Sequence, residues 1–244
     1  PDLTAPGVEI LAGHTPAPAR RSPGQGGELF QVLAGTSGAA AHVAGAGLLL
    51  KQLHPDWTPG DIMSALMMTA RTEDLVKEDG QEELIPADPF DYGAGRLDLA
   101  RAAGVTLTMA PTAQEFRDHA ADLWNTNHPS LHLPSMPGRV VVQRTIRNHW
   151  HDDLKWFISA QEPEGVSISV TNQVRVQPGA EETIEIIVEA EGVPLGEVRH
   201  TAIEFKLDDF TMYMPLTIVR QQPLVSLETK WPRPRGCFPP IHKT

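Results

Sequence analysis

The chain has 244 residues, enough for two modest domains, and its 41% of hydrophobic residues is ordinary for a globular protein. Its 31 acidic side chains outnumber the 20 basic ones, and the net charge of -11 argues against nucleic acid or an anionic membrane as the partner. A single cysteine, Cys237, excludes an internal disulfide framework. The sequence contains no run of 18 or more apolar residues, so no membrane-spanning helix is predicted.

The first predicted elements are a strand and a loop. Apolar and β-branched residues indicate a strand from Thr4 to Ile10. The segment from His14 to Gly27 is dense in proline and glycine, which predicts a loop. Such a loop could border a substrate cleft, but an ordinary surface connection is the simpler interpretation.

The sequence Gly35-Thr36-Ser37-Gly38 places the hydroxyl group of Ser37 at the N-terminus of a predicted helix. Glycine allows close backbone approach, and the N–H groups of a helix's first turn can stabilise a developing oxyanion. A turn with an ordinary helix cap would explain these four residues taken alone. The helix is predicted from Ser37 to Leu53, because His54-Pro55 stops it, and its small residues up to Gly47 indicate a central, buried position.

A second helix is predicted to begin with Thr58 as its N-cap and Pro59 in the first helical position. Asp61 would lie near the positive end of its dipole. The helical spacing of the apolar residues predicts that Asp61 and Ser64 face solvent while one stripe packs inward. That stripe consists of Ile62, Ala65, Leu66 and Thr69. The charged residues 73–83 then predict an exposed excursion.

Four ordered blocks carry a family resemblance: PDLTAPGVEI at 1–10, GTSGAAAHVAG at 35–45, HPDWTPGDIMSALMMTA at 54–70 and DYGAGRLDLARAA at 91–103. They resemble the subtilisin-like serine proteases, the subtilases. The resemblance implies that residues 1–110 are the C-terminal part of an α/β catalytic domain. It makes Ser37 the nucleophile that forms an acyl-enzyme, with Gly35 and Thr36 next to the substrate backbone.

Two positions depart from the family pattern without removing a reacting group. Gly38 stands where the family usually has methionine, and Ala41 stands where it nearly always has proline. Proline suits the first turn of a helix, so alanine would loosen this segment modestly. His42 occupies a position that the family uses structurally, and a core histidine that is packed or satisfied by a hydrogen bond is the expected role.

The other members of the expected triad are missing from their usual places. In subtilases the chain order is Asp, His, Ser, with the histidine about 150 residues before the serine, whereas only 36 residues precede Ser37. His14 and Asp2 are the only upstream histidine and aspartate, and no family motif surrounds His14. We therefore expect the upstream part of the same domain to supply the histidine, the aspartate and the oxyanion asparagine.

Two consequences are expected for the isolated chain. Without a base to activate Ser37, it should be catalytically inactive. Without most of the parallel sheet, the first helix should expose an apolar face, and the first hundred residues should be poorly stable.

Residues 111–126 have weak patterns and predict a linker. Beyond it the sequence alternates between apolar and polar residues, as half-buried strands do. Turn signals at 163–165, 177–179 and 192–194 separate the strands, and about seven strands are expected between residues 130 and 220 in an antiparallel sandwich. The clearest alternations are Val166 to Val170, Ile184 to Glu189 and Ile203 to Leu207.

The second half resembles the fibronectin-type-III-like domain found at the C-terminus of some large subtilases. The segment Asn127 to Ser130 matches the Asn-x-Pro-Ser sequence that opens its first strand. The resemblance implies an all-β sandwich at residues 127–221 that braces the catalytic domain, with no catalytic residue of its own. Residues 222–244 are rich in proline and show neither the helical spacing nor the strand alternation of apolar residues, and they are predicted to be disordered.

The subtilase resemblance also implies a polypeptide substrate, an extracellular location with any targeting signal upstream, and a possible role for calcium. For the acidic residues 73–83, a solvated loop is a simpler interpretation than a calcium site, because the ligand alternation of an EF-hand is absent. The alternative function is non-catalytic: a pseudo-protease that lost its histidine and aspartate, or a β-sandwich binding or scaffolding module. Histidine and aspartate motifs upstream of this chain would distinguish the two.

Overall fold

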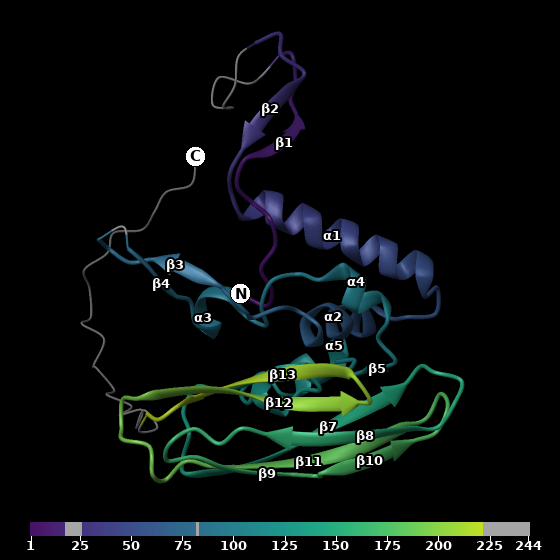
Figure 1. Cartoon of the computed structure of the whole chain (residues 1–244), viewed down its shortest axis with the longest axis vertical. Helices are drawn as coiled ribbons and strands as arrows, with labels where there is room; N and C mark the ends of the chain where they lie inside the picture. The colour runs from purple at the N-terminus through teal and green to yellow at the C-terminus, as the bar shows by residue number, and fades with distance from the viewer. Residues whose placement is uncertain (18–25, 82, 222–244) are drawn as a thin grey trace, which may run out of the picture.

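The computed structural model describes residues 1–17, 26–81 and 83–221. The tail predicted to be disordered and most of the predicted loop between His14 and Gly27 lie outside these residues. A helical part (residues 1–104) lies against a β-rich part (residues 107–219), which we call the β region (Figure 1). The chain is therefore a mixed helix-and-sheet part followed by a region in which strands predominate.

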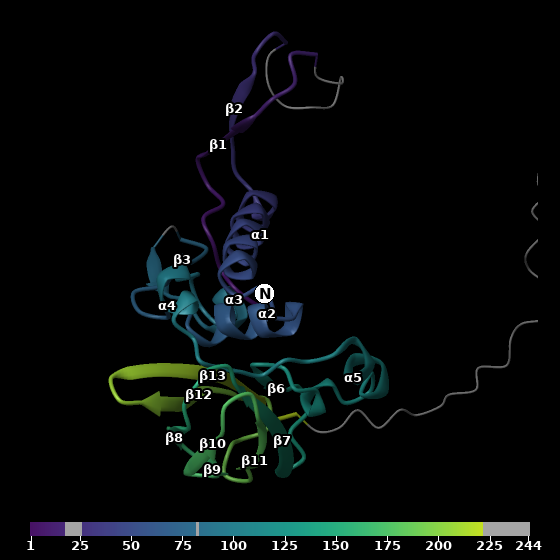
Figure 2. The ribbon, with the colours of Figure 1, turned by 90° about the vertical axis from the view of Figure 1, so that its right-hand side faces the viewer.

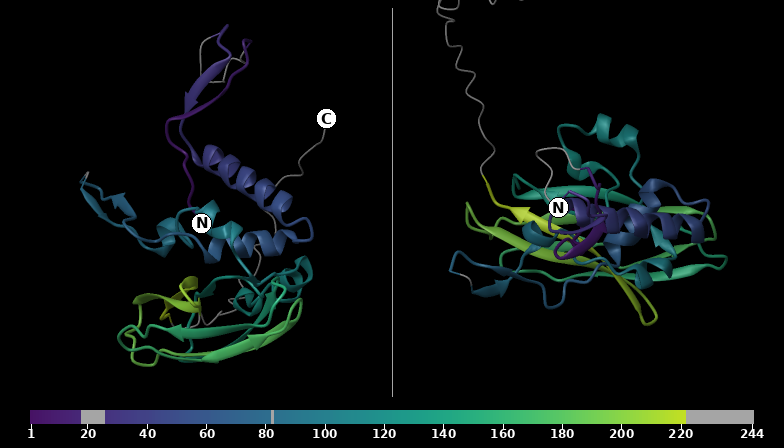
Figure 3. Two further views of the ribbon diagram at one scale, coloured as in Figure 1. Left: turned by 45° about the vertical axis from the view of Figure 1, so that its right-hand side comes forward. Right: turned by 90° about the horizontal axis from the view of Figure 1, so that it is seen from above.

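The N-terminal strand lies later than predicted. The strands β1 (Ile10–Gly13) and β2 (Phe30–Leu33) form an antiparallel hairpin that projects away from the rest of the chain (Figure 3). Of the segment from Thr4 to Ile10, only Thr4 makes an isolated bridge, to Arg96, besides the start of β1. The prediction of a strand over Thr4 to Ile10 is wrong, because Glu9 has a φ of 56°, which breaks the extended backbone.

Both predicted helices are confirmed. Helix α1 (Thr36–Leu53) ends directly before His54-Pro55. Helix α2 (Pro59–Met68) has Thr58 as its N-cap, and the side chains and backbone N–H groups of Thr58 and Asp61 form a reciprocal capping box.

The predicted exposure of α2's polar residues is wrong. Asp61 is 1% exposed and Ser64 is completely buried. Helix α2 lies between α1 and the β region (Figure 2), so the face that carries these polar side chains meets protein groups rather than water.

The charged excursion contains a small hairpin of β3 (Val76–Glu78) and β4 (Leu84–Pro86). Two short helices follow, α3 (Pro89–Tyr92) and α4 (Leu99–Ala103). The predicted linker at 111–126 contains α5 (Ala113–Asp118) and the 3-10 helix η1 (Leu123–Asn125).

The β region consists of two sheets, with strand orders β10-β8-β12-β13-β6 and β5-β7-β11-β9. All of their pairs are antiparallel except β6 with β13. Seven strands were predicted between 130 and 220, and the described chain has eight there. Together with β5, the strands are β5 (Leu107–Thr108), β6 (Leu131–Leu133), β7 (Arg139–Asn148), β8 (Leu154–Ala160), β9 (Ser167–Val170), β10 (Gln173–Val176), β11 (Glu181–Glu189), β12 (Val198–Leu207) and β13 (Phe210–Val219).

One hydrophobic core runs through both parts. It includes Ala46 and Leu50 of α1, Trp57 and Ala65 at α2, and the inward side chains of both sheets. The strand prediction from alternating residues is confirmed, because Ile184, Ile186 and Val188 of β11 are all buried.

Helix α1 is not the buried helix that its small residues suggested. Of its side chains, Leu48, Leu49 and Leu53 are exposed, and its buried residues are Gly38, Ala46 and Leu50. No described element covers its outer face (Figure 2), so the expectation of an uncovered apolar face is confirmed. Within the described chain, no helix combines the length and the apolar character that a membrane crossing requires.

Candidate active site

Two glycines bring the N-terminal segment close to the start of α1. The N–H of Gly35 donates to the carbonyl oxygen of Gly7 at 2.7 Å. A Cβ atom on Gly7 would lie 2.8 Å from the Gly35 carbonyl oxygen, and Gly35 itself has a φ of 154°. The close approach therefore depends on glycine at position 7, and the chain turns into α1 immediately before Ser37.

Ser37 lies exposed in the first turn of α1. Gly35 is the N-cap and provides no side-chain acceptor, so no capping side chain competes for the N–H groups of this turn. Gly35 and Thr36 are also exposed. The arrangement presents a hydroxyl group beside helix N–H groups and the positive end of a helix dipole, which are suited to stabilise an oxyanion.

Ser37 borders a hollow of about 720 Å³ between α1 and the β1–β2 hairpin. Apolar side chains such as Ile10, Leu33 and Leu49 line most of it, and His42 is also at its wall. The Nδ1 atom of His42 lies 3.0 Å from the carbonyl oxygen of Gly38 in its own helix. The prediction that His42 lies in the core is wrong, because the face of α1 that carries it is uncovered; its ring is nevertheless satisfied by the contact with the Gly38 carbonyl.

The structure does not bring the upstream histidine or aspartate to Ser37. His14 lies at the end of β1, with Nδ1 3.1 Å from the carbonyl oxygen of Glu28. Asp2 lies near the turn before Arg96, where its carbonyl oxygen accepts from the N–H of Ala94. Among the described residues, no histidine or carboxylate is hydrogen-bonded to the Ser37 hydroxyl.

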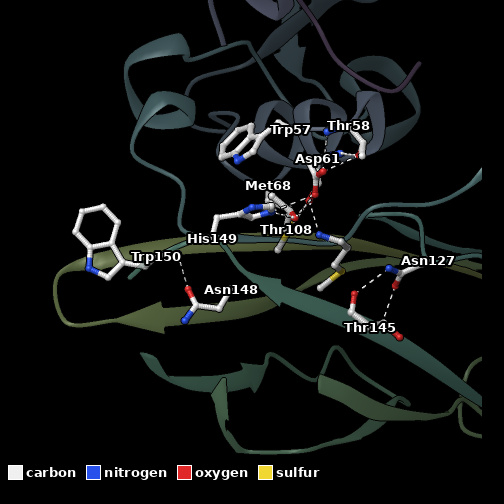
Figure 4. Close-up of polar contacts among 12 residues, drawn as sticks. Trp57, Thr58, Asp61, Met68, Thr108, Asn127, Thr145, Asn148, His149 and Trp150 are labelled. Atoms are coloured by element: carbon white, nitrogen blue, oxygen red, sulfur yellow. Dashed lines mark hydrogen bonds and ion pairs between the residues drawn. The ribbon is translucent and has the colours of Figure 1, made fainter. Parts of the chain in front are cut away.

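A second polar cluster joins α2 to the β region (Figure 4). The carboxylate of Asp61 accepts from the hydroxyl of Thr108 at 2.6 Å and lies 3.2 Å from Nε2 of His149. Its other oxygen accepts from the backbone N–H of Thr58 at 2.8 Å and from the Thr58 hydroxyl at 2.6 Å. Burial raises the pKa of Asp61, but the hydrogen bonds from His149, Thr108 and Thr58 outweigh it and hold that pKa well below its usual range.

This cluster contains the residue types of a hydrolytic triad but lacks a nucleophile that a substrate could reach. Thr108 is completely buried, and its hydroxyl bonds directly to the carboxylate rather than only to the histidine. Its place between two parts of the chain indicates a structural junction. The sequence interpretation missed it, because a polar residue on an amphipathic helix is ordinarily assigned to solvent.

Arg144 is another buried polar residue that the sequence interpretation did not single out. It is 1% exposed, and its guanidinium donates to four backbone carbonyls, of Trp124, His128, Ser130 and Gln143. Burial lowers its pKa to about 10. The alternation of side chains along β7 could have revealed its burial, since it places Arg144 on the same face as Val142 and Ile146.

The described residues contain no group of three or more histidine, cysteine, aspartate or glutamate side chains that could hold a metal ion.

Comparison with known proteins connects the Ser37 segment to one family. Residues 1–95 match the model of the subtilase family. The chain is similar to two proteases from Arabidopsis thaliana: subtilisin-like protease SBT3.10, 32% identical over 199 residues, and subtilisin-like protease SBT5.4, 31% identical over 203 residues. Each match covers 70% of this chain and 25% of the relative, so the chain spans about a quarter of the length of these relatives.

The chain is also similar, over part of its length, to solved structures. The PapD-like domain 7 of human CEP192 is 15% identical, with 39% of this chain and 82% of that domain covered, at a TM-score of 0.31.

Proposed function

Since residues 1–95 match the subtilase family, we propose that this chain is the nucleophile-bearing part of a subtilisin-like serine endopeptidase. The whole protein would hydrolyse peptide bonds through an acyl-enzyme on Ser37. The substrate is a polypeptide, and the family resemblance favours an extracellular location with calcium as a possible cofactor.

The observation that carries this proposal is the position of Ser37 in the first turn of α1. Its side chain is exposed at the edge of a hollow of about 720 Å³, and no side chain caps the helix at this end. The flanking Gly35 allows a substrate backbone to come close. The geometry supports acyl transfer at this hydroxyl.

In the proposed reaction, the Ser37 hydroxyl oxygen attacks the scissile carbonyl carbon while a histidine from outside this chain takes its proton. The backbone N–H of Ser37 donates to the developing oxyanion. The tetrahedral intermediate collapses, the C–N bond breaks, and the histidine gives the proton to the leaving amine. Water then attacks the acyl-enzyme, releases the acid and restores the hydroxyl.

The remaining chain would support this site. Gly35 and Thr36 would lie along the substrate backbone. The upstream part of the same catalytic domain would provide the histidine, the aspartate and the oxyanion asparagine, and it would cover the outer face of α1. The β region would act as a fibronectin-type-III-like brace.

The test is peptide hydrolysis by the longer protein that contains this chain, compared with its Ser37→Ala variant. We expect Ser37→Ala to lower kcat by a factor of about 10⁴ or more, because a triad acts as a unit. The matched control is Ser169→Ala, which changes an exposed serine of β9 in the β region, and it should leave hydrolysis unchanged. Absence of hydrolysis in the unaltered protein would favour the non-catalytic alternative, a pseudo-protease or binding module.

A further inference from the structure

The face of α2 that meets the β region carries two buried polar residues one turn apart. Asp61 accepts from Thr108, as described above, and the hydroxyl of Ser64 accepts from the backbone N–H of Met109 at 2.8 Å. Two positions of the helix thus bond to two successive residues of the chain at β5. This pairing fixes both the rotation of α2 about its axis and its position along it.

The partner segment is in turn fastened to the sheet. Strand β5 pairs with the end of β7, with Thr108 opposite Arg147. The N–H of His149, just after β7, donates to the carbonyl oxygen of Thr106 at 2.8 Å, and its Nε2 lies 2.8 Å from the Thr108 hydroxyl. The junction of Asp61, Thr108 and His149 therefore ties α2 to β7, one of the three longest strands of the β region.

The opposite side of α2 reaches α1. A Cβ on Gly47 of α1 would lie 3.6 Å from Cγ2 of Ile62, and the ammonium of Lys51 donates to the carbonyl oxygen of Trp57 at 2.7 Å. The Trp57 ring stacks on His54 at 3.9 Å and lies 5.2 Å from the His149 ring. Contacts therefore run from His149 to the helix that carries Ser37 by two routes, one through Asp61 and Ile62 of α2 and one through Trp57 in the loop before α2.

The hydrogen bonds of the junction restrict the orientation of α2 in a way that apolar packing does not. Burial of apolar surface is not directional, whereas hydrogen bonds to a buried carboxylate demand a defined geometry, and loss of one leaves the buried charge with one partner fewer. The apolar core alone would hold α2 on the β region. The polar junction would select one orientation of it.

We propose that Thr108 and His149 are positioning residues: through Asp61 they set the orientation of α2, and through α2 they hold α1 and Ser37 in place. The role of Ser37 rests on the proposed function, but the coupling of the β region to α1 does not. It is therefore testable on the chain itself.

The test is hydrogen exchange of backbone amides in residues 1–244, compared between α1 (residues 36–53) and the sheet strands β7 and β11. In Thr108→Val, which removes only the hydroxyl, we expect exchange in α1 and α2 to be about tenfold faster, because a buried charged acceptor loses a partner. Exchange in β7 and β11 should stay the same. Thr108→Ser, which keeps the hydroxyl, should restore slow exchange in α1.

The matched control is Thr183→Val, the same change at an exposed position of β11, and it should leave α1 unchanged. If Thr108→Val fails to fold, His149→Leu provides the same comparison, with His149→Gln as the variant that keeps a donor. Equal acceleration in α1, β7 and β11 would mean general destabilisation and would overturn the proposal. No acceleration in α1 would overturn it as well.

A second readout separates this proposal from the proposed function. In the longer protein, the rate at which a fluorophosphonate labels Ser37 should fall in Thr108→Val and recover in Thr108→Ser. No labelling of the unaltered protein would count against Ser37 as a nucleophile but would leave the exchange result standing. Labelling that is unchanged in Thr108→Val would count against the positioning role alone.

Discussion

The surroundings of Ser37 are set by small residues. A Cβ on Gly7 would lie 2.8 Å from the carbonyl oxygen of Gly35, and a Cβ on Gly38 would lie 3.3 Å from Cδ1 of Leu33. Glycine at these two positions lets the N-terminal segment and the β1–β2 hairpin close onto the first turn of α1. The hydroxyl is thereby held at the edge of the hollow rather than displaced from it.

Asp61 is the residue whose removal should affect stability most clearly. Asp61→Ala removes the acceptor of four hydrogen bonds, and we expect it to lower the free energy of unfolding by about 3 kcal/mol at pH 7, measured by urea denaturation. Asp56→Ala, an exposed aspartate in the preceding loop, is the control and should change it by less than about 0.5 kcal/mol.

The contribution of Asp61 has a defined dependence on pH. The folded pKa of Asp61 lies below its ordinary value of 3.8, so its stabilisation is complete above that value and is lost as the pH falls through the folded pKa. The difference between the unaltered chain and Asp61→Ala should persist at mildly acidic pH and shrink only below about pH 4. A difference that already disappears near pH 6 would contradict the assigned hydrogen bonds.

The residues of the candidate site differ in how far the sequence could reveal them. Ser37 and Gly35 lie in one local pattern, so they could be identified without the fold. The junction of Asp61, Thr108 and His149 could not be identified in this way. Asp61 and His149 are 88 residues apart. The helical pattern shows that one face of α2 is polar, but it does not show whether water or another part of the chain lies against that face. Arg144 was visible only as a charged residue on an inward face of β7.

At the scale of elements, α2 is held on the β region by close backbone contact as well as by polar bonds. A Cβ on Gly60 would lie 2.9 Å from the carbonyl oxygen of Pro111. In α1, by contrast, a Cβ on Gly45 would meet no atom within 4 Å. The two helical glycines can therefore be compared directly, because Gly60 is packed against backbone and Gly45 faces open space.

We expect opposite effects of the same substitution at these two glycines. Gly45→Ala should raise the free energy of unfolding of this chain by about 0.5–1 kcal/mol, because alanine favours the helix. Gly60→Ala should lower it by about 1–3 kcal/mol despite the same gain, because the backbone of residues 110–111 must move. Thermal unfolding followed by circular dichroism distinguishes them, and stabilisation by Gly60→Ala would show that α2 does not lie against this segment.

The elements that were predicted correctly have local signals. The limits of α1 and α2 follow from His54-Pro55 and from the Thr58–Asp61 capping box, and the long strands follow from alternation. Strand β5 has only two residues, too few for a period. The shift of the first strand from Thr4 to Ile10 depends on the backbone angle at Glu9, which its residue type does not predict.

For the whole molecule, the uncovered face of α1 is the main feature. Leu48 is 72% exposed, whereas Leu50, two residues along the same helix, is 1% exposed. Leu50→Ala should lower the free energy of unfolding of residues 1–244 by about 2–5 kcal/mol, and Leu48→Ala should change it by less than about 0.5 kcal/mol. In the longer protein, Leu48→Ala should become costly, because the rest of the catalytic domain would cover it. Equal costs for Leu48→Ala in both contexts would contradict that arrangement.

The most direct test of the central claim is labelling with a fluorophosphonate probe, which reacts with activated serines. It is applied to the longer protein, to residues 1–244, and to the Ser37→Ala variant of each. We predict labelling of the longer protein alone, abolished by Ser37→Ala, because the hydroxyl is activated only when the upstream histidine is present. Labelling of the longer protein that survives Ser37→Ala, or no labelling of either protein, would contradict the assignment of Ser37 as the nucleophile.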